Sequence, residues 1–225
     1  MGQAIAFVNQ KGGCGKSTAS VQKAEWLRKK GHDVLLIDSD AQQSSSKWAA
    51  ALENPLPCTI LKTANEILDK VFELTEQHEY LVIDGPAGID EVTRAILMTC
   101  DIAVMPCQPG LVDLESTEGT VRIIRHAWKV RGNKPKALTF VSRARGTVIA
   151  RETYSRMKKG KDWQGIEVLD TPIHNREIIT DARGQDATLW DLTTASTKKV
   201  REPATTAAKE FEALFKAILE ASTDG

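Results

Sequence analysis

The stretch "VNQKGGCGKST" at residues 8–18 decides the fold, because it joins a short apolar run to a long amphipathic segment. The run "AIAFVN", which overlaps its start, is typical of a buried strand, and "ASVQKAEWLRKKG" after it is typical of a helix that Gly31 ends. Strand, glycine-rich turn and helix form the context in which a loop binds phosphate. The usual pattern G-x-x-x-x-G-K-[ST] requires glycine at Gln10, however, and a second lysine, Lys11, follows that position.

Three glycines give this loop its capacity to bind phosphate. Gly12, Gly13 and Gly15 permit positive φ and let backbone N–H groups approach phosphate oxygens, while the helix that follows adds the positive end of its dipole. Lys16 supplies a charge for the β- and γ-phosphates, and Ser17 supplies a hydroxyl for Mg²⁺. The alternative is a glycine-rich turn without a ligand, and the G-K-S sequence in this context favours the nucleotide loop.

Three aspartates follow apolar runs that are typical of strands. Asp38 and Asp40 lie in "DVLLIDSDAQ", and Asp84 lies in "YLVIDGPAG". Magnesium keeps several of its waters and is held by one or two carboxylates, so such residues fit a Mg-nucleotide site. Aspartates at strand ends are often only helix caps or turn formers. Because the same chain contains a phosphate loop, we favour the metal site.

The chain has 225 residues, of which 41% are hydrophobic and 27% charged, as is ordinary for a soluble globular protein. We expect a single domain over residues 1–225, with no domain before the phosphate loop. No apolar run approaches the roughly 18 residues that a membrane-spanning helix needs, and no signal-like segment precedes the first strand. The four cysteines contain no C-x-x-C pair that would indicate zinc or redox chemistry. A cytoplasmic protein is expected.

Short apolar runs alternate with helix-length amphipathic segments along the chain, which predicts an α/β fold. We expect a three-layer P-loop NTPase fold with a mostly parallel central sheet flanked by helices, because the strands are apolar on both faces. Strands are predicted at residues 4–9, 33–38, 80–85, 101–107, 136–142 and 166–171. Helices are predicted at residues 16–30, 64–76, 90–98, 114–130, 148–159 and 203–220.

The formal net charge is zero, but the charges are segregated along the chain. Residues 66–118 hold twelve acids and two bases, whereas residues 119–151 hold nine bases and no acid. On the predicted helix 114–130 the spacing i, i+3, i+7 puts Arg122, Arg125 and Lys129 on one face. This face is either a solvated surface or a site for the DNA backbone. Continuing positive charge beyond the helix favours DNA. The candidate DNA-binding residues are Arg122, Arg125, Lys129, Arg131, Arg145 and Arg151.

Three motifs, "KGGCGKST", "DSDAQ" and "YLVIDGPAG", resemble in this order the deviant Walker A, A′ and B motifs of the ParA/MinD ATPases. The similarity to the ParA partition branch extends through "VMPCQPGLVDLESTEG" to "IHNREIITDARGQ". The spacing resembles that of short ParA proteins without an N-terminal DNA-binding domain. The resemblance implies ATP and Mg²⁺ as cofactors and an ATP-dependent homodimer, in which Lys11 reaches the phosphates bound by the other subunit.

The resemblance also implies individual roles. Asp40 would position or activate the attacking water, with Asp38 supporting it and with Lys11 and Lys16 as further catalytic residues. Residues 85–88 would form a switch that senses the γ-phosphate. Two departures from the family pattern are Ala41, where proline is usual, and "GPAG" in place of a di-proline. The implied metal ligands are Ser17, Asp38 and Asp84. The implied nucleotide-binding residues are Lys11, Gly12, Gly13, Cys14, Gly15, Lys16, Ser17, Thr18, Arg143, Pro172 and Ile173.

The resemblance makes a ParA-type partition ATPase the leading expectation. Its ATP-bound dimers would coat DNA nonspecifically and be nucleoid-associated, and a ParB-like adaptor would stimulate hydrolysis to position plasmid, chromosome or other cargo. One alternative is a MinD-like ATPase on a membrane, although the last helix ends in acid and is expected to pack on the domain. Another is a small-molecule ATP-dependent synthetase on the same fold. Because no guanine-reading N-K-x-D motif is present, ATP is favoured over GTP.

Overall fold

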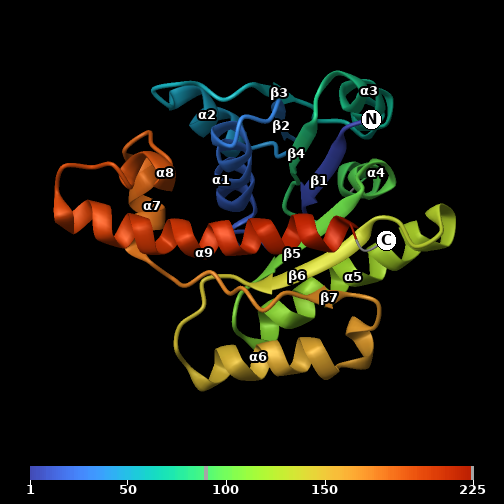
Figure 1. Ribbon diagram of the computed structural model, residues 1–225. Coiled ribbons are helices and arrows are strands. Elements are labelled where there is room, and N and C mark those ends of the chain that lie inside the picture. Colours follow the sequence, from blue (N-terminus) through green and yellow to red (C-terminus); the bar gives the residue numbers. More distant parts are fainter. Residues whose placement is uncertain (89–90, 224–225) are drawn as a thin grey trace.

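The computed structural model describes residues 1–88 and 91–223, and its centre is a seven-stranded sheet in which every pairing is parallel (Figure 1). The strand order is β3-β2-β4-β1-β5-β6-β7. The strands are β1 (Gln3–Phe7), β2 (Val34–Asp38), β3 (Cys58–Ile60), β4 (Tyr80–Asp84), β5 (Ile102–Cys107), β6 (Lys136–Val141) and β7 (Glu167–Val168).

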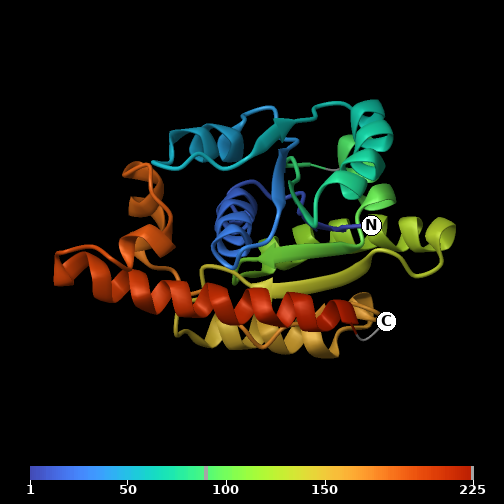
Figure 2. The ribbon, with the colours of Figure 1, turned by 45° about the horizontal axis from the view of Figure 1, so that its top comes forward.

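Helices cover both faces of this sheet, so the predicted three-layer α/β fold is confirmed (Figures 1 and 2). One face packs against α1 (Lys16–Lys29), α2 (Ser44–Ala51), α7 (Glu177–Gly184), α8 (Leu189–Leu192) and α9 (Lys198–Thr223). The other face packs against α3 (Ala64–Gln77), α4 (Glu91–Thr99), α5 (Leu111–Arg131), α6 (Val148–Lys159) and the short 3-10 helix η1 (Lys161–Trp163). Among the described helices, none combines the length and the apolar character needed to cross a bilayer.

The strands are apolar throughout because each contributes side chains to two cores. In β1, Ile5 and Phe7 lie in the core beneath α1 and α9, whereas Ala4 and Ala6 lie in the core beneath α3, α4 and α5. All four side chains are fully buried. Burial on both faces is the physical reason why these strands read as continuous apolar runs rather than as alternating ones.

Several boundaries differ from the prediction. Helix α5 begins at Leu111, and α9 begins at Lys198, so that Pro203 lies inside α9 instead of at its first position. The strand predicted at 166–171 is reduced to the two residues of β7, and the elements β3, α2, α7 and α8 were not predicted. The start predicted for the helix at 90–98 falls on Asp90, which lies outside the described residues.

The sheet positions the phosphate loop at the point where its strand order reverses. Strand β1 lies between β4 and β5, and residues 8–15 connect it to α1. At the same edge, Asp84 is the register partner of Phe7 on one side and of Asp38 on the other. The carboxyl ends of parallel strands at such a reversal form the crevice in which α/β proteins bind ligands. The predicted loop and the predicted aspartates therefore lie at one edge of the sheet.

Candidate nucleotide-binding site

The phosphate loop has the backbone conformation that its glycines allow. Gly13 has φ 73° and Gly15 has φ 103°, both in the left-handed region that side chains disfavour. Gly15 is also the N-cap of α1, so the first turn of that helix opens directly onto the loop. Backbone N–H groups at a helix N-terminus carry partial positive charge and bind phosphate. This geometry fits the predicted nucleotide loop.

Asn9 holds the start of the loop and was not identified from the sequence. Its buried side-chain Nδ2 donates to the backbone carbonyl of Pro106 (2.8 Å) and to Oγ1 of Thr117 (2.9 Å). Its Oδ1 accepts from the backbone N–H of Lys11 (3.0 Å). One amide thus connects β1, β5, α5 and the loop. The two partners of its Nδ2, Pro106 and Thr117, are about a hundred residues away in sequence, so no local pattern marks this role.

Gln10, the residue that departs from the usual glycine pattern, lies against α5. Its backbone N–H donates to Oγ1 of Thr120 (3.1 Å). A Cβ placed on Gly119 of the same helix would lie 2.6 Å from Gln10 Oε1, so a glycine permits this close approach. On the opposite side, Gln108 Nε2 donates to the carbonyl of Gly13 (2.7 Å). The loop is therefore fixed by side chains from the β5–α5 region as well as by its own glycines.

The two lysines of the loop differ in their surroundings. The Lys16 side chain is buried, and its Nζ donates to the backbone carbonyl oxygen of Lys11 (3.2 Å). Lys11 is partly exposed, and its backbone atoms rather than its side chain make the contacts that hold the loop. Cys14 Sγ donates to the same Lys11 oxygen (3.2 Å), and burial raises the pKa of this thiol. Cys14 is therefore a small packing residue of the loop.

Asp84 fits a ligand of a hard cation. Its carboxylate is fully buried, and neither oxygen has a hydrogen-bond partner among residues 1–88 and 91–223. Burial raises the pKa of Asp84 to about 7, although the nearby hydroxyls of Ser17 and Ser45 and the ammonium of Lys16 act to lower it. A buried carboxylate without a partner is unfavourable unless a positive group pairs with it. The predicted Ser17 and Asp84 thus lie together in a pattern suited to Mg²⁺.

Asp38 has a different arrangement from Asp84. Its Oδ1 accepts from the backbone N–H of Asp40 (3.0 Å), and its Oδ2 accepts from the backbone N–H of Ser46 (2.8 Å). Both oxygens therefore hold the turn between β2 and α2, which fits a supporting role beside Asp40, while the role of Asp38 as a metal ligand stays a prediction. Asp40 Oδ1 accepts from the N–H of Gln42 (2.8 Å), and the side chain is partly exposed at the edge of the site. Asp38 positions the turn that carries Asp40.

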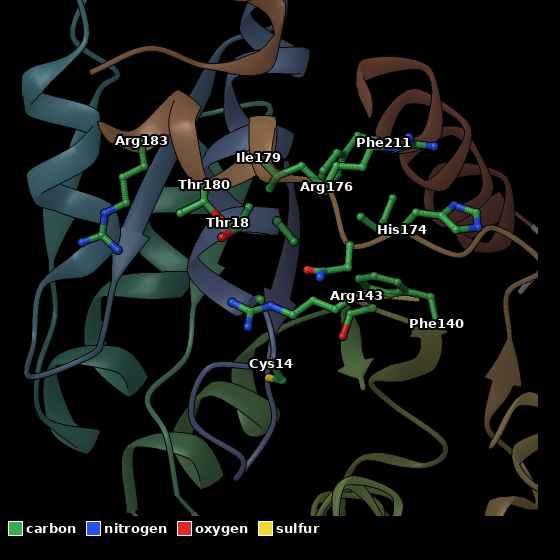
Figure 3. Close-up of a pocket in the computed structure, with 15 residues that line it drawn as sticks. Cys14, Thr18, Phe140, Arg143, His174, Arg176, Ile179, Thr180, Arg183 and Phe211 are labelled. Atoms are coloured by element: carbon green, nitrogen blue, oxygen red, sulfur yellow. The ribbon is translucent and has the colours of Figure 1, made fainter. Parts of the chain in front are cut away.

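A cavity opens beside the phosphate loop, on the side of β6 (Figure 3). Figure 3 shows side chains from the loop, from α7 and from α9 gathered around it. Its mixed apolar and polar lining is typical of a site for a small molecule. The lining residues are Cys14, Gly15, Thr18, Ala19, Phe140, Ser142, Arg143, Ile173, His174, Asn175, Arg176, Ile179, Thr180, Arg183 and Phe211.

The structure separates the residues predicted to contact the base. Thr18, Arg143 and Ile173 line this cavity, which we call the base cavity, together with the loop residues 14 and 15. Pro172 lies instead on a neighbouring cavity, with Arg145, Arg151 and Tyr154. Pro172 and Ile173 are neighbours in the chain but line different cavities. Pro172 is not among the residues that line the base cavity, so its contact with the base stays a prediction.

An irregular segment, residues 173–176, forms the far wall of the base cavity and was mostly missed from the sequence. The N–H of Ala144 donates to the carbonyl of Ile173, and the N–H of Asn175 donates to the carbonyl of Ala144, both at 2.8 Å. These bonds continue the parallel sheet past the end of β6. Asn175 presents both an amide donor and an acceptor, as recognition of a base edge requires.

The six predicted DNA-binding residues divide into two groups. Arg122 and Lys129 are exposed on α5, and Arg145 and Arg151 are exposed near the start of α6. Within the described part of the chain, none of these four takes part in an ion pair.

The other two arginines have structural contacts. Arg125 donates to the carbonyls of Asp162 (3.0 Å) and Gln164 (3.2 Å), and Arg131 donates to the carbonyls of Leu97 (2.9 Å) and Cys100 (2.6 Å). These guanidinium groups bind backbone carbonyls near η1 and at the end of α4, and DNA binding by these two arginines stays a prediction.

Comparisons with known proteins agree with this geometry. Residues 5–189 match the family described as the CobQ/CobB/MinD/ParA nucleotide binding domain. The chain is 24% identical over 192 residues to the maintenance of carboxysome distribution protein A of Halothiobacillus neapolitanus, covering 84% of this chain and 87% of that protein. It is 24% identical over 179 residues to protein ParA of Rhizobium radiobacter, covering 76% of this chain and 78% of that one.

Solved structures show the same fold. Apo McdA of Cyanothece superposes with a TM-score of 0.73 at 16% identity, covering 95% of this chain and all of that chain. MinD of Pyrococcus horikoshii, in complex with Mg-ADP, gives a TM-score of 0.69 at 16% identity, covering 97% and 96%. The phosphate loop, the carboxylates at the strand ends and the match over most of its length lead to one conclusion: this chain belongs to the ParA/MinD family of nucleotide-binding ATPases.

Proposed function

We propose that this protein is a Mg²⁺-dependent ATPase of the ParA type, which forms a dimer on ATP, binds DNA nonspecifically as that dimer and positions a cargo. The observation that carries the proposal is that the two lysines of the phosphate loop differ in burial and in their contacts. Lys16 is buried, and its Nζ donates to the carbonyl oxygen of Lys11 within the loop, whereas Lys11 itself is partly exposed. We infer that Lys16 binds the phosphates of its own protomer and that the side chain of Lys11 is available to a second protomer.

The residues of one protomer account for binding of the triphosphate. The N–H groups of the loop and the ammonium of Lys16 would hold the β- and γ-phosphates, and Ser17 and Asp84 would hold Mg²⁺. The metal, when bound, would neutralise charge on the phosphate oxygens. Asp40, carried by the turn that Asp38 fixes, would accept a hydrogen bond from the attacking water and orient it.

The dimer would depend on ATP because of charge. Lys11 of each protomer would extend to the triphosphate of the other, where the γ-phosphate concentrates negative charge. ADP lacks that group, so the contact across the dimer would weaken after hydrolysis. A ligand can shift an equilibrium only by its differential affinity for the two states, and the γ-phosphate supplies this difference.

The exposed bases Arg122, Lys129, Arg145 and Arg151 support the DNA part of the proposal. Contacts of arginine and lysine with phosphates need no base readout and weaken as salt rises. A dimer would present the set twice, so its avidity for DNA would exceed that of a monomer. The protein would then be cytoplasmic and nucleoid-associated, and a ParB-like adaptor on the cargo would stimulate hydrolysis and release it.

The names of two relatives indicate which kinds of cargo the protein would position. One relative is named for carboxysome distribution, and another is named ParA. A protein assembly and a DNA molecule are therefore both candidates, and the adaptor protein would decide between them. A membrane is not favoured, because Phe211, Leu214, Phe215 and Ile218 on the apolar face of α9 are buried in the core instead of being available to lipid.

Binding to a random-sequence duplex tests the DNA half of the proposal. At low salt, fluorescence anisotropy should show binding with Mg²⁺ and a non-hydrolysable ATP analogue and much weaker binding with ADP. The double variant Arg122→Ala, Lys129→Ala should weaken binding and reduce its salt dependence. Lys198→Ala, Lys199→Ala at the exposed start of α9 is the matched control and should behave as the wild type. Equal binding with ATP analogue and ADP would contradict the proposed switch.

A further inference from the structure

Helix α9 packs beside the base cavity and forms hydrogen bonds both with α1 and with the wall segment, residues 173–176. Phe211 on α9 lines the cavity and is almost fully buried. One turn later, the carbonyl of Phe215 accepts a hydrogen bond from Nζ of Lys23 (3.2 Å) on α1, the helix that carries Thr18. The residue before Phe211, Glu210, contacts the opposite wall.

Glu210 is the hydrogen-bond acceptor that holds the wall segment 173–176. Its Oε2 accepts from the backbone N–H of His174 (3.0 Å). Its Oε1 lies 3.0 Å from Nδ1 of His174 and accepts from the guanidinium of Arg176 (2.6 Å). Figure 3 shows His174 pointing toward α9 and away from Thr18. Two residues of the wall are thus held by one carboxylate from a helix distant in sequence.

The surroundings of Glu210 keep it charged. Its side chain is 18% exposed. Burial alone would raise its pKa, but the hydrogen bonds from Arg176 and His174 outweigh burial and hold the pKa of Glu210 below its ordinary value. Hydrogen bonds to a charged group are about twice as strong as neutral ones, so the wall depends on this carboxylate more than on an ordinary polar contact.

Ile173 of the wall segment is buried in the core, whereas the side chains of His174 and Arg176 are held by Glu210. Residues 173–176 lie between β7 and α7, in neither a helix nor a strand, and are joined to the end of β6 by backbone bonds. Asn175 lies between the two residues that Glu210 holds, and it lines the base cavity. A shift of the segment around His174 and Arg176 would therefore displace Asn175 relative to a bound base, while leaving the phosphate loop in place.

We propose that Glu210 is a positioning residue for recognition of the nucleotide base, because it fixes the wall of the base cavity through His174 and Arg176. The inference rests on the proposed binding of a nucleotide at the phosphate loop. It predicts that Glu210 affects the affinity for a nucleotide and leaves unchanged the affinity for a ligand that consists of phosphates alone. Preorganised contacts determine affinity and specificity in such sites, and a small displacement weakens them.

Calorimetric titration of the full chain with Mg-ADP and with Mg-tripolyphosphate tests the proposal. Glu210→Gln keeps the shape of the side chain but removes its charge, so we expect about tenfold weaker binding of ADP and unchanged binding of tripolyphosphate. Glu210→Asp, which restores the charge, should recover part of the loss. Glu212→Gln is the matched control, because Glu212 lies on the same helix and pairs with Lys30 and Lys216 at the surface. It should change neither affinity.

Two results would overturn the proposal: wild-type affinity of Glu210→Gln for ADP, or an equal loss of affinity for both ligands. The second result would indicate a general structural role for Glu210. Failure of the proposed function would be seen separately, as absence of an ATP-dependent dimer in the wild type. A selective loss of ADP binding in Glu210→Gln would still support the role of Glu210 in that case.

Discussion

The ammonium group of Lys16 lies 3.2 Å from the backbone carbonyl oxygen of Lys11, so one hydrogen bond joins the two lysines of the phosphate loop. Through this bond Lys16 is directed into the loop, while the side chain of Lys11 stays partly exposed. The same bond lets the backbone of Lys11 shape the site even when its side chain is replaced. Substitutions at these two positions should therefore have different effects.

Lys16→Ala should weaken binding of Mg-ATP by roughly ten- to a hundredfold, because charged hydrogen bonds to phosphate contribute about 1.5–3 kcal/mol. Lys11→Ala should leave binding to the isolated protomer within about threefold of the wild type, since its backbone contacts remain. Calorimetric titration at a protein concentration that keeps the protein monomeric measures both. Equal losses in the two variants would contradict the separate roles.

Asn9→Ala should weaken nucleotide binding by about tenfold and lower the free energy of unfolding by about 1–3 kcal/mol, because it removes three hydrogen bonds around the loop. The groups concerned are the carbonyl of Pro106, the hydroxyl of Thr117 and the N–H of Lys11. Titration with Mg-ADP and urea unfolding measure the two effects. Asn65→Ala on the exposed face of α3 is the control and should leave both quantities unchanged. Wild-type affinity in Asn9→Ala would show that the loop keeps its shape without this residue.

The buried Lys23 should make stability depend on pH. Burial lowers the pKa of Lys23 from 10.5 to about 7 in the folded protein. Between these values the unfolded chain binds the extra proton, so the contribution of Lys23 to the free energy of unfolding rises with pH. Below about pH 7 both states are protonated, and this contribution no longer changes.

The difference in Tm between the wild type and Lys23→Met should therefore move in favour of the wild type as pH rises from about 7 to about 9.5. Thermal unfolding monitored by circular dichroism measures it. Lys209→Met, at an exposed position of α9, is the control and should show no such trend. A difference that does not change with pH would mean that Lys23 stays charged in the folded protein.

Substitution of Arg131 should affect stability, whereas substitution of Arg122 should affect DNA binding. Arg131→Ala should lower the free energy of unfolding by about 1–3 kcal/mol, because its guanidinium satisfies the carbonyls of Leu97 and Cys100 at the end of α4. Arg122→Ala should leave stability within about 0.5 kcal/mol of the wild type and weaken DNA binding. Urea unfolding and anisotropy on a random duplex measure the two effects. If Arg131→Ala weakened DNA binding at wild-type stability, the result would indicate that Arg131 contacts DNA.

Local sequence was sufficient to predict the phosphate loop and the strands β1, β2, β4, β5 and β6, whereas β3 was not predicted and β7 is shorter than predicted. Gly13 and Gly15 have the expected positive φ, and Asp84 lies where a strand-end carboxylate was expected. These features follow from short-range chemistry, namely glycine conformation and apolar runs buried on both faces. Their positions relative to one another follow from the parallel order of the strands.

The walls of the site could not be predicted in the same way. Asn9 is held by residues about a hundred positions away, and Glu210 contacts His174 across 36 positions. Such partners are brought together only by the fold and leave no local pattern. The contacts of Arg125 and Arg131 with backbone carbonyls were missed for the same reason, since a charge pattern alone does not distinguish a free guanidinium from one bound to the fold.

Sedimentation velocity of the wild type tests the central claim most directly. With Mg²⁺ and a non-hydrolysable ATP analogue, we predict a dimer, whereas with Mg-ADP we predict a monomer. Lys11→Ala should bind the analogue and remain monomeric. A wild-type protein that stays monomeric with saturating ATP analogue, or a Lys11→Ala variant that dimerises as the wild type does, would contradict a dimer joined by lysines reaching the opposite triphosphate.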